Sequence, residues 1–230
     1  MTLAKEPGTG NSAVIPTPKL EEDFYDWYAR HEAKCRAAAA CGHDLVFIGD
    51  SLTHLFEGDP NVPNRGERLW KDYYGARRAL NLGFGWDRTQ NVLWRLTHGE
   101  FAGQTPRLVV ILIGTNNLTG TAKAPTNSPA EIADGVQAIC AQIVAASPRS
   151  RVLLMGVFPR GGSPTDPMRA RVREINAILK PYAARSSAII FADIGDRFVS
   201  PDGCISVDIM NDGVHLTEKG YRIWADTIEP

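Results

Sequence analysis

The stretch LVVILIG, residues 108–114, is apolar throughout up to its closing glycine. A strand of this composition is buried on both faces, as in a parallel sheet that helices cover on each side. Four more short apolar runs have the same character, at residues 45–49, 79–83, 151–158 and 188–194. Together these runs predict a five-stranded parallel sheet.

Segments with helical periodicity alternate with the strands, at residues 20–40, 128–146 and 166–184. The second of them has Ser128 as a favoured N-cap, Pro129 at the first helical position and Glu131 completing a capping box. In the first, Leu20 and Phe24 continue the spacing of an apolar helix face. The alternation predicts an α/β protein with three layers, α/β/α, right-handed crossovers and the flavodoxin-like strand order.

The domain organisation follows from composition. Residues 1–19 are rich in Gly, Pro, Thr and Ser and show no periodicity, which predicts an N-terminal arm packed along the domain or a second subunit. No change in composition divides the remainder, so residues 20–230 are expected to form a single domain.

Charge and hydropathy exclude several partners. The formal net charge is -1 and basic residues form no block, so no nucleic-acid partner is expected. No run approaches the roughly 20 apolar residues of a membrane span, and no signal-like apolar region opens the chain. We therefore expect no integral membrane segment and a cytoplasmic location, unless an export signal has been removed.

The four cysteines show neither a C-x-x-C pair nor histidines at zinc-ligand spacing. They are interpreted as small hydrophobic residues, with a bridge between Cys35 and Cys41 only in a secreted chain. No metal or other cofactor is expected.

Polar residues follow each predicted strand, where a parallel sheet places its ligand crevice. They are GDS (49–51), GFGWD (83–87), GTNN (114–117), PRGG (159–162) and the later NDGVHL (211–216). The glycines of GFGWD match only part of a dinucleotide-binding fingerprint and are weak evidence for a nucleotide.

The components of nucleophilic acyl transfer are all present in these turns. Ser51 supplies a hydroxyl, and Asp212 stands three residues before His215, where it can fix the imidazole tautomer. The Ser51 N–H, the Gly83 N–H and the Asn116 amide are candidate donors to an oxyanion. Thr217, as the N-cap of a following helix, would anchor the backbone after His215.

Each residue also has a structural interpretation. Ser51 could be a helix N-cap, Gly83 and Asn116 turn residues, and Asp212 with His215 part of a surface loop. The structural interpretation is weaker for the residues taken together. It requires that four independent turns present the components of a triad and an oxyanion hole at the same edge of one sheet.

The chain resembles the SGNH (GDSL-type) serine hydrolases. Their blocks are matched, in order, by GDSL (49–52), NLGFG (81–85), GTNN (114–117) and DGVH (212–215). The resemblance implies that Ser51 is the nucleophile, that Gly83 and Asn116 hold the oxyanion, and that Asp212 and His215 complete the triad.

From about Asp44 onward the chain is similar to the branch of catalytic subunits of intracellular platelet-activating factor acetylhydrolases. The likeness is carried by TQNVLWRLTHGEF (89–101), VVILIGTNN (109–117), VFPRGG (157–162) and DGVHLTEKGY (212–221). It implies removal of short acyl groups, chiefly acetyl, and assembly into dimers. Trp86 departs from the pattern, because a second small residue is more usual there.

These observations predict a serine esterase that hydrolyses a small-molecule ester, with an acetyl group as the leading acyl class. The large apolar residues nearest the catalytic blocks are expected to bind substrate: Leu52, Trp86, Val214 and Leu216. The alcohol could belong to a phospholipid or, in a carbohydrate O-acetylesterase, to a sugar. The alternative function without catalysis is a dimeric interaction module. A metal-dependent hydrolase is less favoured, because carboxylates and histidines do not cluster at metal-ligand spacing.

Overall fold

Five parallel strands form one sheet in the computed structural model, which describes residues 10–40, 42–63 and 65–229. The strands are β1 (Leu45–Gly49), β2 (Ala79–Gly83), β3 (Leu108–Leu112), β4 (Arg151–Met155) and β5 (Ile189–Ala192). Their order is β2-β1-β3-β4-β5, and every neighbouring pair is parallel. The predicted flavodoxin-like order is confirmed.

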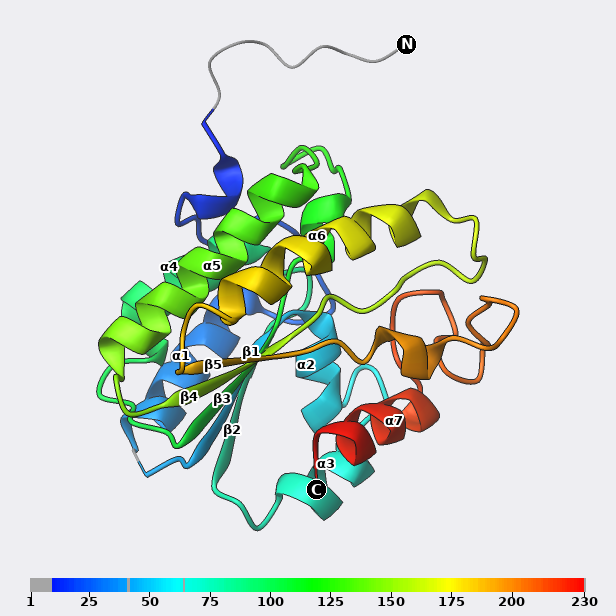
Figure 1. Cartoon of the computed structure of the whole chain (residues 1–230). Helices are drawn as coiled ribbons and strands as arrows, with labels where there is room; N and C mark the ends of the chain where they lie inside the picture. Colours follow the sequence, from blue (N-terminus) through cyan, green and yellow to red (C-terminus); the bar gives the residue numbers. More distant parts are fainter. Residues whose placement is uncertain (1–9, 41, 64, 230) are drawn as a thin grey trace.

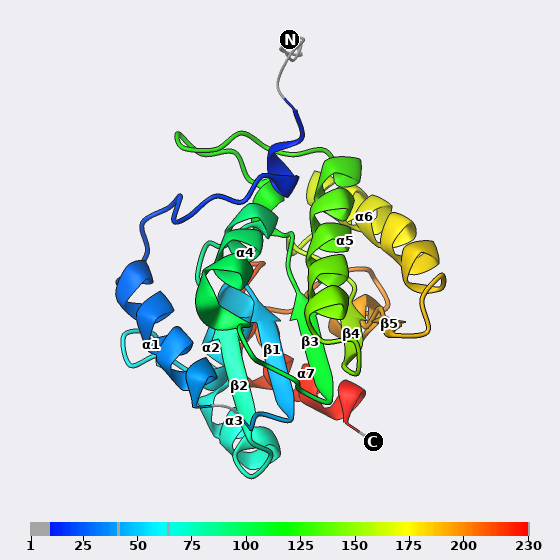
Figure 2. The ribbon, with the colours of Figure 1, turned by 90° about the vertical axis from the view of Figure 1, so that its left-hand side faces the viewer.

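Helices cover both faces of the sheet (Figures 1 and 2). One side carries α4 (Thr89–Arg95), α5 (Pro129–Ala146) and α6 (Pro167–Ala183). The other carries α2 (Ser51–Glu57), α3 (Glu67–Tyr74) and α7 (Glu218–Ile228), and α1 (Trp27–Ala39) contacts β2. Four short helices complete the fold: η1 (Ser12–Val14), η2 (Leu96–Glu100), η3 (Asn116–Leu118) and η4 (Gly195–Phe198). Two buried apolar clusters, one on each sheet face, form the core of the predicted three-layer α/β/α fold.

Strand β3 is shorter than the apolar run that predicted it. It ends at Leu112, and Gly114 has a backbone φ of 123°, which residues with side chains rarely adopt. A Cβ at Gly114 would also lie 2.9 Å from Cγ2 of Ile132 in α5. The chain therefore leaves the sheet at this glycine and turns toward the crevice.

The first helix begins later than predicted. The Asp26 side chain accepts hydrogen bonds from the N–H groups of Tyr28 and Ala29 and caps α1 at Trp27, so residues 20–26 lie outside the helix. The cap of α5 is as predicted, with Ser128, Pro129 and Glu131 in the expected roles. The Asp26 cap thus decides where α1 begins, although the apolar spacing that predicted a helix starts at Leu20.

The described part of the N-terminal segment packs on α4 and α5. Ala13 is fully buried, and its carbonyl accepts a hydrogen bond from Thr89 Oγ1 at 2.8 Å. Asn91 Nδ2 donates to the carbonyls of Thr17 and Pro18. Residues 1–9 of the predicted arm lie outside the described residues, and the division into arm and single domain stays a prediction.

Two further findings concern the chain as a whole. Within residues 10–40, 42–63 and 65–229, no helix combines the length and the apolar character that crossing a bilayer requires. Cys35, Cys140 and Cys204 are free thiols, whereas Cys41, the other half of the conditional bridge, lies outside the described residues.

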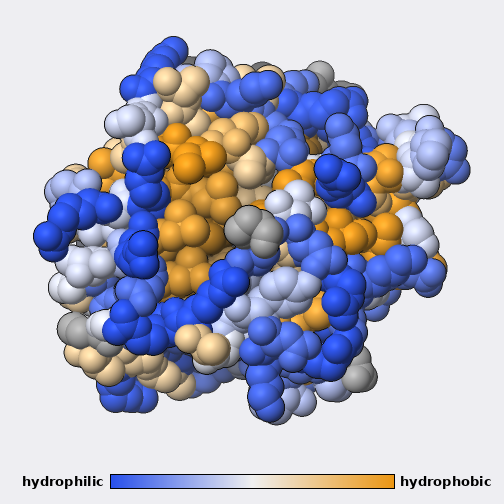
Figure 3. All heavy atoms as spheres, turned by 60° about the horizontal axis from the view of Figure 1, so that its bottom comes forward, coloured by the Kyte–Doolittle hydropathy of each residue, from blue (hydrophilic) through white to orange (hydrophobic). Residues whose placement is uncertain are grey.

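Figure 3 shows a broad hydrophobic area on the face that points downward in Figure 1.

Candidate active site

Ser51 is the first residue of α2, directly after β1. The N-cap is Asp50, whose Oδ1 accepts the Leu52 N–H at 3.0 Å, so the interpretation of Ser51 as the cap is wrong. Gly49 is the last residue of the strand, and glycine is needed there because a Cβ would lie 2.4 Å from the Leu112 carbonyl oxygen. This tight strand-to-helix turn leaves the Ser51 N–H without an intrahelical acceptor.

A chain of hydrogen bonds joins Ser51, His215 and Asp212. The Ser51 Oγ lies 2.9 Å from His215 Nε2, and His215 Nδ1 lies 2.7 Å from Asp212 Oδ2. With the Nδ1 proton donated to Asp212, Nε2 is left to accept the serine proton. The geometry is that of a nucleophile, a general base and an orienting carboxylate.

The Asp212 carboxylate is held in its charged form. Partial burial disfavours the charge, but hydrogen bonds from the His215 side chain and from the N–H groups of His215 and Val214 outweigh it. They hold the pKa of Asp212 well below its usual range. The carboxylate therefore stays available to His215 across the neutral pH range.

The backbone after His215 is anchored in the core. Thr217 caps α7 by accepting the Gly220 N–H, as predicted, and Leu216 and Tyr221 are fully buried. Tyr221 Oη donates to the Leu52 carbonyl at 2.8 Å, which ties α7 to the helix that carries Ser51. This contact limits relative movement of His215 and Ser51.

The Asn116 side chain lines the same pocket as Ser51. Its Nδ2 donates one hydrogen bond to the Asp87 carbonyl at 3.0 Å, and a carboxamide nitrogen has a second hydrogen to donate. The Asp87 carboxylate in turn accepts from Trp27 Nε1 and Arg95 Nε, at 2.8 and 2.7 Å. The amide of Asn116 is thus fixed by a buried polar network.

Gly83 does not take the position expected of an oxyanion donor. Its N–H donates to Asn81 Oδ1 at 2.8 Å, and Gly83 does not line the pocket. Glycine is needed there because a Cβ would lie 2.2 Å from the backbone nitrogen of His54 in α2. Trp86 lines the pocket instead, with a backbone φ of 62°, and its N–H has no acceptor among the described residues.

The pocket around Ser51 has a volume of about 360 Å³. Of the four predicted substrate-binding residues it contains Trp86 and Val214, while Leu52 and Leu216 are packed in the core beneath α2 and α7. Leu52 and Leu216 directly follow Ser51 and His215 in the chain and turn into the core, whereas Val214, which precedes His215, reaches the pocket. The sequence did not identify seven further lining residues: Asp23, Phe24, Leu55, Val62, Arg65, Thr119 and Arg160.

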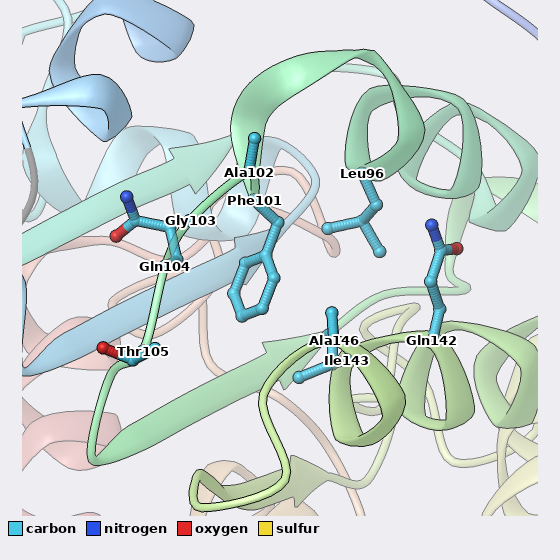
Figure 4. Close-up of a pocket in the computed structure, with 9 residues that line it drawn as sticks. All are labelled: Leu96, Phe101, Ala102, Gly103, Gln104, Thr105, Gln142, Ile143 and Ala146. Atoms are coloured by element: carbon cyan, nitrogen blue, oxygen red, sulfur yellow. The ribbon is translucent and has the colours of Figure 1, made fainter.

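A second cavity, of about 260 Å³, lies between η2, the segment after it and α5 (Figure 4). Its walls contain no charged side chain, histidine or cysteine and therefore offer no nucleophile with a neighbouring base. The lining residues are Leu96, Phe101, Ala102, Gly103, Gln104, Thr105, Gln142, Ile143 and Ala146. Among the described residues, no three His, Cys, Asp or Glu side chains are grouped in a way that could hold a metal ion.

Comparison with known proteins shows the family of the chain. The model of the GDSL-like Lipase/Acylhydrolase family matches residues 47–223. Platelet-activating factor acetylhydrolase IB subunit alpha2 of Rattus norvegicus is 32% identical over 215 residues, which cover 93% of this chain and 87% of the relative.

Solved structures share the fold. A GDSL-like lipase from Bacteroides thetaiotaomicron superposes with a TM-score of 0.66 at 20% identity, over 88% of this chain and 96% of that one. The acetylxylan esterase Axe2 from Geobacillus stearothermophilus superposes with a TM-score of 0.62 at 20% identity, over 81% and 92%.

Proposed function

Because the chain belongs to the GDSL-like lipase/acylhydrolase family and is a carboxylic ester hydrolase, we propose that it cleaves short-chain esters through an acyl-enzyme on Ser51. The observation that carries the proposal is the hydrogen-bonded chain from Ser51 Oγ through His215 to Asp212. A serine activated in this way attacks ester carbonyls.

The reaction proceeds in two halves. Ser51 Oγ attacks the ester carbonyl while His215 Nε2 takes its proton, and a tetrahedral oxyanion forms. Collapse of this intermediate breaks the bond to the alcohol, which receives the proton from His215. Water then attacks the acyl-enzyme with His215 as the base and releases the acid, while Asp212 holds the imidazole in place.

Three neutral donors are proposed to stabilise the oxyanion: the N–H groups of Ser51 and Trp86 and the Asn116 amide. Support comes from the position of all three residues at one pocket and from the free N–H of Trp86. Trp86 replaces Gly83 in this role, since the Gly83 N–H is already used by Asn81. Donors fixed before the reaction need no rearrangement in the transition state.

An acetyl group is the proposed acyl part of the substrate. Trp86, Val214 and Leu55 give the pocket apolar walls, which suit the methyl group of an acetyl ester. The name of the rat relative, an acetylhydrolase, supports the same acyl class. Acyl length is measured with p-nitrophenyl esters from acetate to octanoate, for which we expect the highest kcat/KM with acetate.

The test of the mechanism is Ser51→Ala. The variant should lose turnover of p-nitrophenyl acetate and labelling by an organophosphonate, while its circular dichroism stays that of the wild type. Full turnover in the variant would exclude the proposed nucleophile. Failure of the wild type to react with the organophosphonate would favour the non-catalytic interaction module.

The proposed assembly is a homodimer. Ile190 on the edge strand β5 is 49% exposed, and the relatives are named as subunits of an acetylhydrolase. Sedimentation at micromolar concentration should give twice the chain mass of 25.1 kDa. The cytoplasmic location stays a prediction.

A further inference from the structure

Two arginines in the catalytic pocket are held by neutral groups. Arg160 Nη1 shares its two hydrogens among three acceptors, the Thr115 carbonyl at 3.0 Å, Thr115 Oγ1 at 3.3 Å and Thr119 Oγ1 at 3.1 Å. Arg65 Nη1 donates to Asn211 Oδ1 at 3.0 Å and to the Leu216 carbonyl at 3.2 Å. Within the described ranges, neither guanidinium has a carboxylate oxygen within 4.0 Å.

The partners of these arginines belong to two loops of the site, one next to His215 and the other next to Asn116. The carbonyl that Arg65 binds belongs to the residue after His215, and the carbonyl that Arg160 binds belongs to the residue before Asn116. Both arginines also line the pocket that contains Ser51. Both charges therefore belong to the wall of the pocket that an ester would occupy.

The surroundings of Arg160 leave its charge only partly compensated. Burial lowers the pKa of its guanidinium, while the more distant Asp166, Asp50 and Asp212 oppose this effect. An arginine remains protonated under such conditions, so a half-buried positive charge faces the pocket. A guanidinium in this state gains from a charge-assisted, bidentate bond to an oxyanion.

Two carboxylates also line the pocket, but neither neutralises these arginines. Asp212 is hydrogen-bonded to His215. Asp23 accepts the Phe24 N–H, and burial raises the pKa of its carboxyl, so its charge is disfavoured. Among the described residues, the two guanidinium groups therefore form no ion pair with the carboxylates of the pocket.

We propose that Arg65 and Arg160 form a subsite for an anionic group, a phosphate or a carboxylate, carried by the alcohol part of the ester. The inference rests on the proposed esterase function and specifies its leaving group. The arginines would draw the anion into the pocket and orient the ester carbonyl toward Ser51 and Asn116.

Four acetyl esters that differ in the charge of the alcohol test the subsite. 4-Acetoxybutanoate carries a carboxylate, and 4-acetoxybutanamide is its neutral counterpart of nearly equal shape. 2-Acetoxyethyl phosphate carries a phosphate, and acetylcholine carries a cation. The wild type should hydrolyse at least one anionic ester with a kcat/KM about tenfold above that of the neutral amide. The anionic ester with the higher kcat/KM shows whether the subsite prefers a phosphate or a carboxylate. A higher kcat/KM for acetylcholine or for the amide overturns the proposal.

Variants assign the preference to the two arginines. Arg65→Gln and Arg160→Gln should each lower the anion-to-amide ratio of kcat/KM about tenfold, mostly through KM, and Arg160→Lys should retain part of it. Arg149→Gln, an exposed site with the same change in charge, should leave the ratio unchanged. If Arg160→Gln lowers kcat equally for all four esters, the residue only positions the Thr115 loop and the subsite is disproved.

A binding measurement separates this proposal from the catalytic one. Calorimetric titration of Ser51→Ala with 2-acetoxyethyl phosphate and 4-acetoxybutanoate measures binding at the subsite in the absence of turnover. Anion binding that Arg160→Gln weakens in this background supports the subsite even if the wild type hydrolyses none of the esters. Absence of binding with intact p-nitrophenyl acetate hydrolysis disproves the subsite and leaves the esterase function standing.

Discussion

Asn116 and Asn117 are neighbours in the chain, yet their side chains have different surroundings. Asn116 lines the catalytic pocket and has one protein partner for its amide nitrogen. Asn117 is fully buried, and its amide nitrogen shares its two hydrogens among three acceptors, Thr89 Oγ1, Gln90 Oε1 and Asn127 Oδ1. Its Oδ1 accepts the Thr89 N–H. One side chain lines the pocket, where we propose that it holds the oxyanion, and the other joins η3 to α4 and to the loop before α5.

Alanine substitutions should therefore separate activity from stability. Asn116→Ala removes an oxyanion donor and should lower kcat about 100- to 1000-fold with little change in the free energy of unfolding. Asn117→Ala leaves several buried groups without partners and should cost about 2 to 4 kcal/mol of stability. Steady-state kinetics and urea unfolding of both variants provide the measurement. Unchanged kcat in Asn116→Ala would remove that residue from the proposed oxyanion hole.

At the scale of elements, the N-terminal segment depends on a close approach between η1 and α5. Gly135 lies in the middle of α5, where a Cβ would be 2.7 Å from the Ala13 carbonyl oxygen and 2.5 Å from Thr89 Oγ1. Glycine normally weakens a helix interior by about 1 kcal/mol relative to alanine. Its presence here is explained by the docked segment, which a side chain would displace.

Gly135→Ala should accordingly lower the melting temperature of the full chain in spite of the better helix propensity. The displaced segment should also become sensitive to proteolysis between residues 10 and 19. In a chain shortened by residues 1–18, the same substitution should cost less, since the Ala13 carbonyl is absent. A raised melting temperature in the full chain would contradict the docking of η1 on α5.

Elements that depend on nearby residues were predictable from the sequence. The capping box at Ser128 and the cap at Thr217 involve residues three positions apart, and their predictions are confirmed. The roles of Arg65 and Arg160 were not predictable, because their partners Leu216 and Thr115 lie 151 and 45 residues away. The helix expected from Leu20 begins only at Trp27, because Asp26 caps it, and Phe24 upstream of the cap lines the pocket instead.

At the scale of the molecule, the pocket is a product of the whole fold. Its walls come from the segment before α1, from α2 and the loop after it, from the loops after β2, β3 and β4, and from the loop before α7. Ser51 and His215 are 164 residues apart and meet because α2 and α7 pack on the same sheet face. Global unfolding therefore destroys the site in one step.

One group beneath the pocket links that global stability to pH. Asp50 is 1% exposed, its Oδ2 has no partner among the described residues, and burial raises its pKa to about 7. In the unfolded chain the carboxyl regains a pKa near 3.9. Between these values the folded state holds more protons than the unfolded state, so this group makes the protein less stable as the pH rises from about 4 to 7.

Asp50→Asn should remove this contribution, because a carboxamide stays neutral and its oxygen can still accept the Leu52 N–H. The two proteins should have similar unfolding free energies near pH 4, and the variant should be more stable above pH 7, by at most about 4 kcal/mol. Urea unfolding from pH 4 to 8 measures the difference, with the exposed Asp196→Asn as a control for the change in charge. A difference that does not vary with pH would show that Asp50 is already ionised throughout this range.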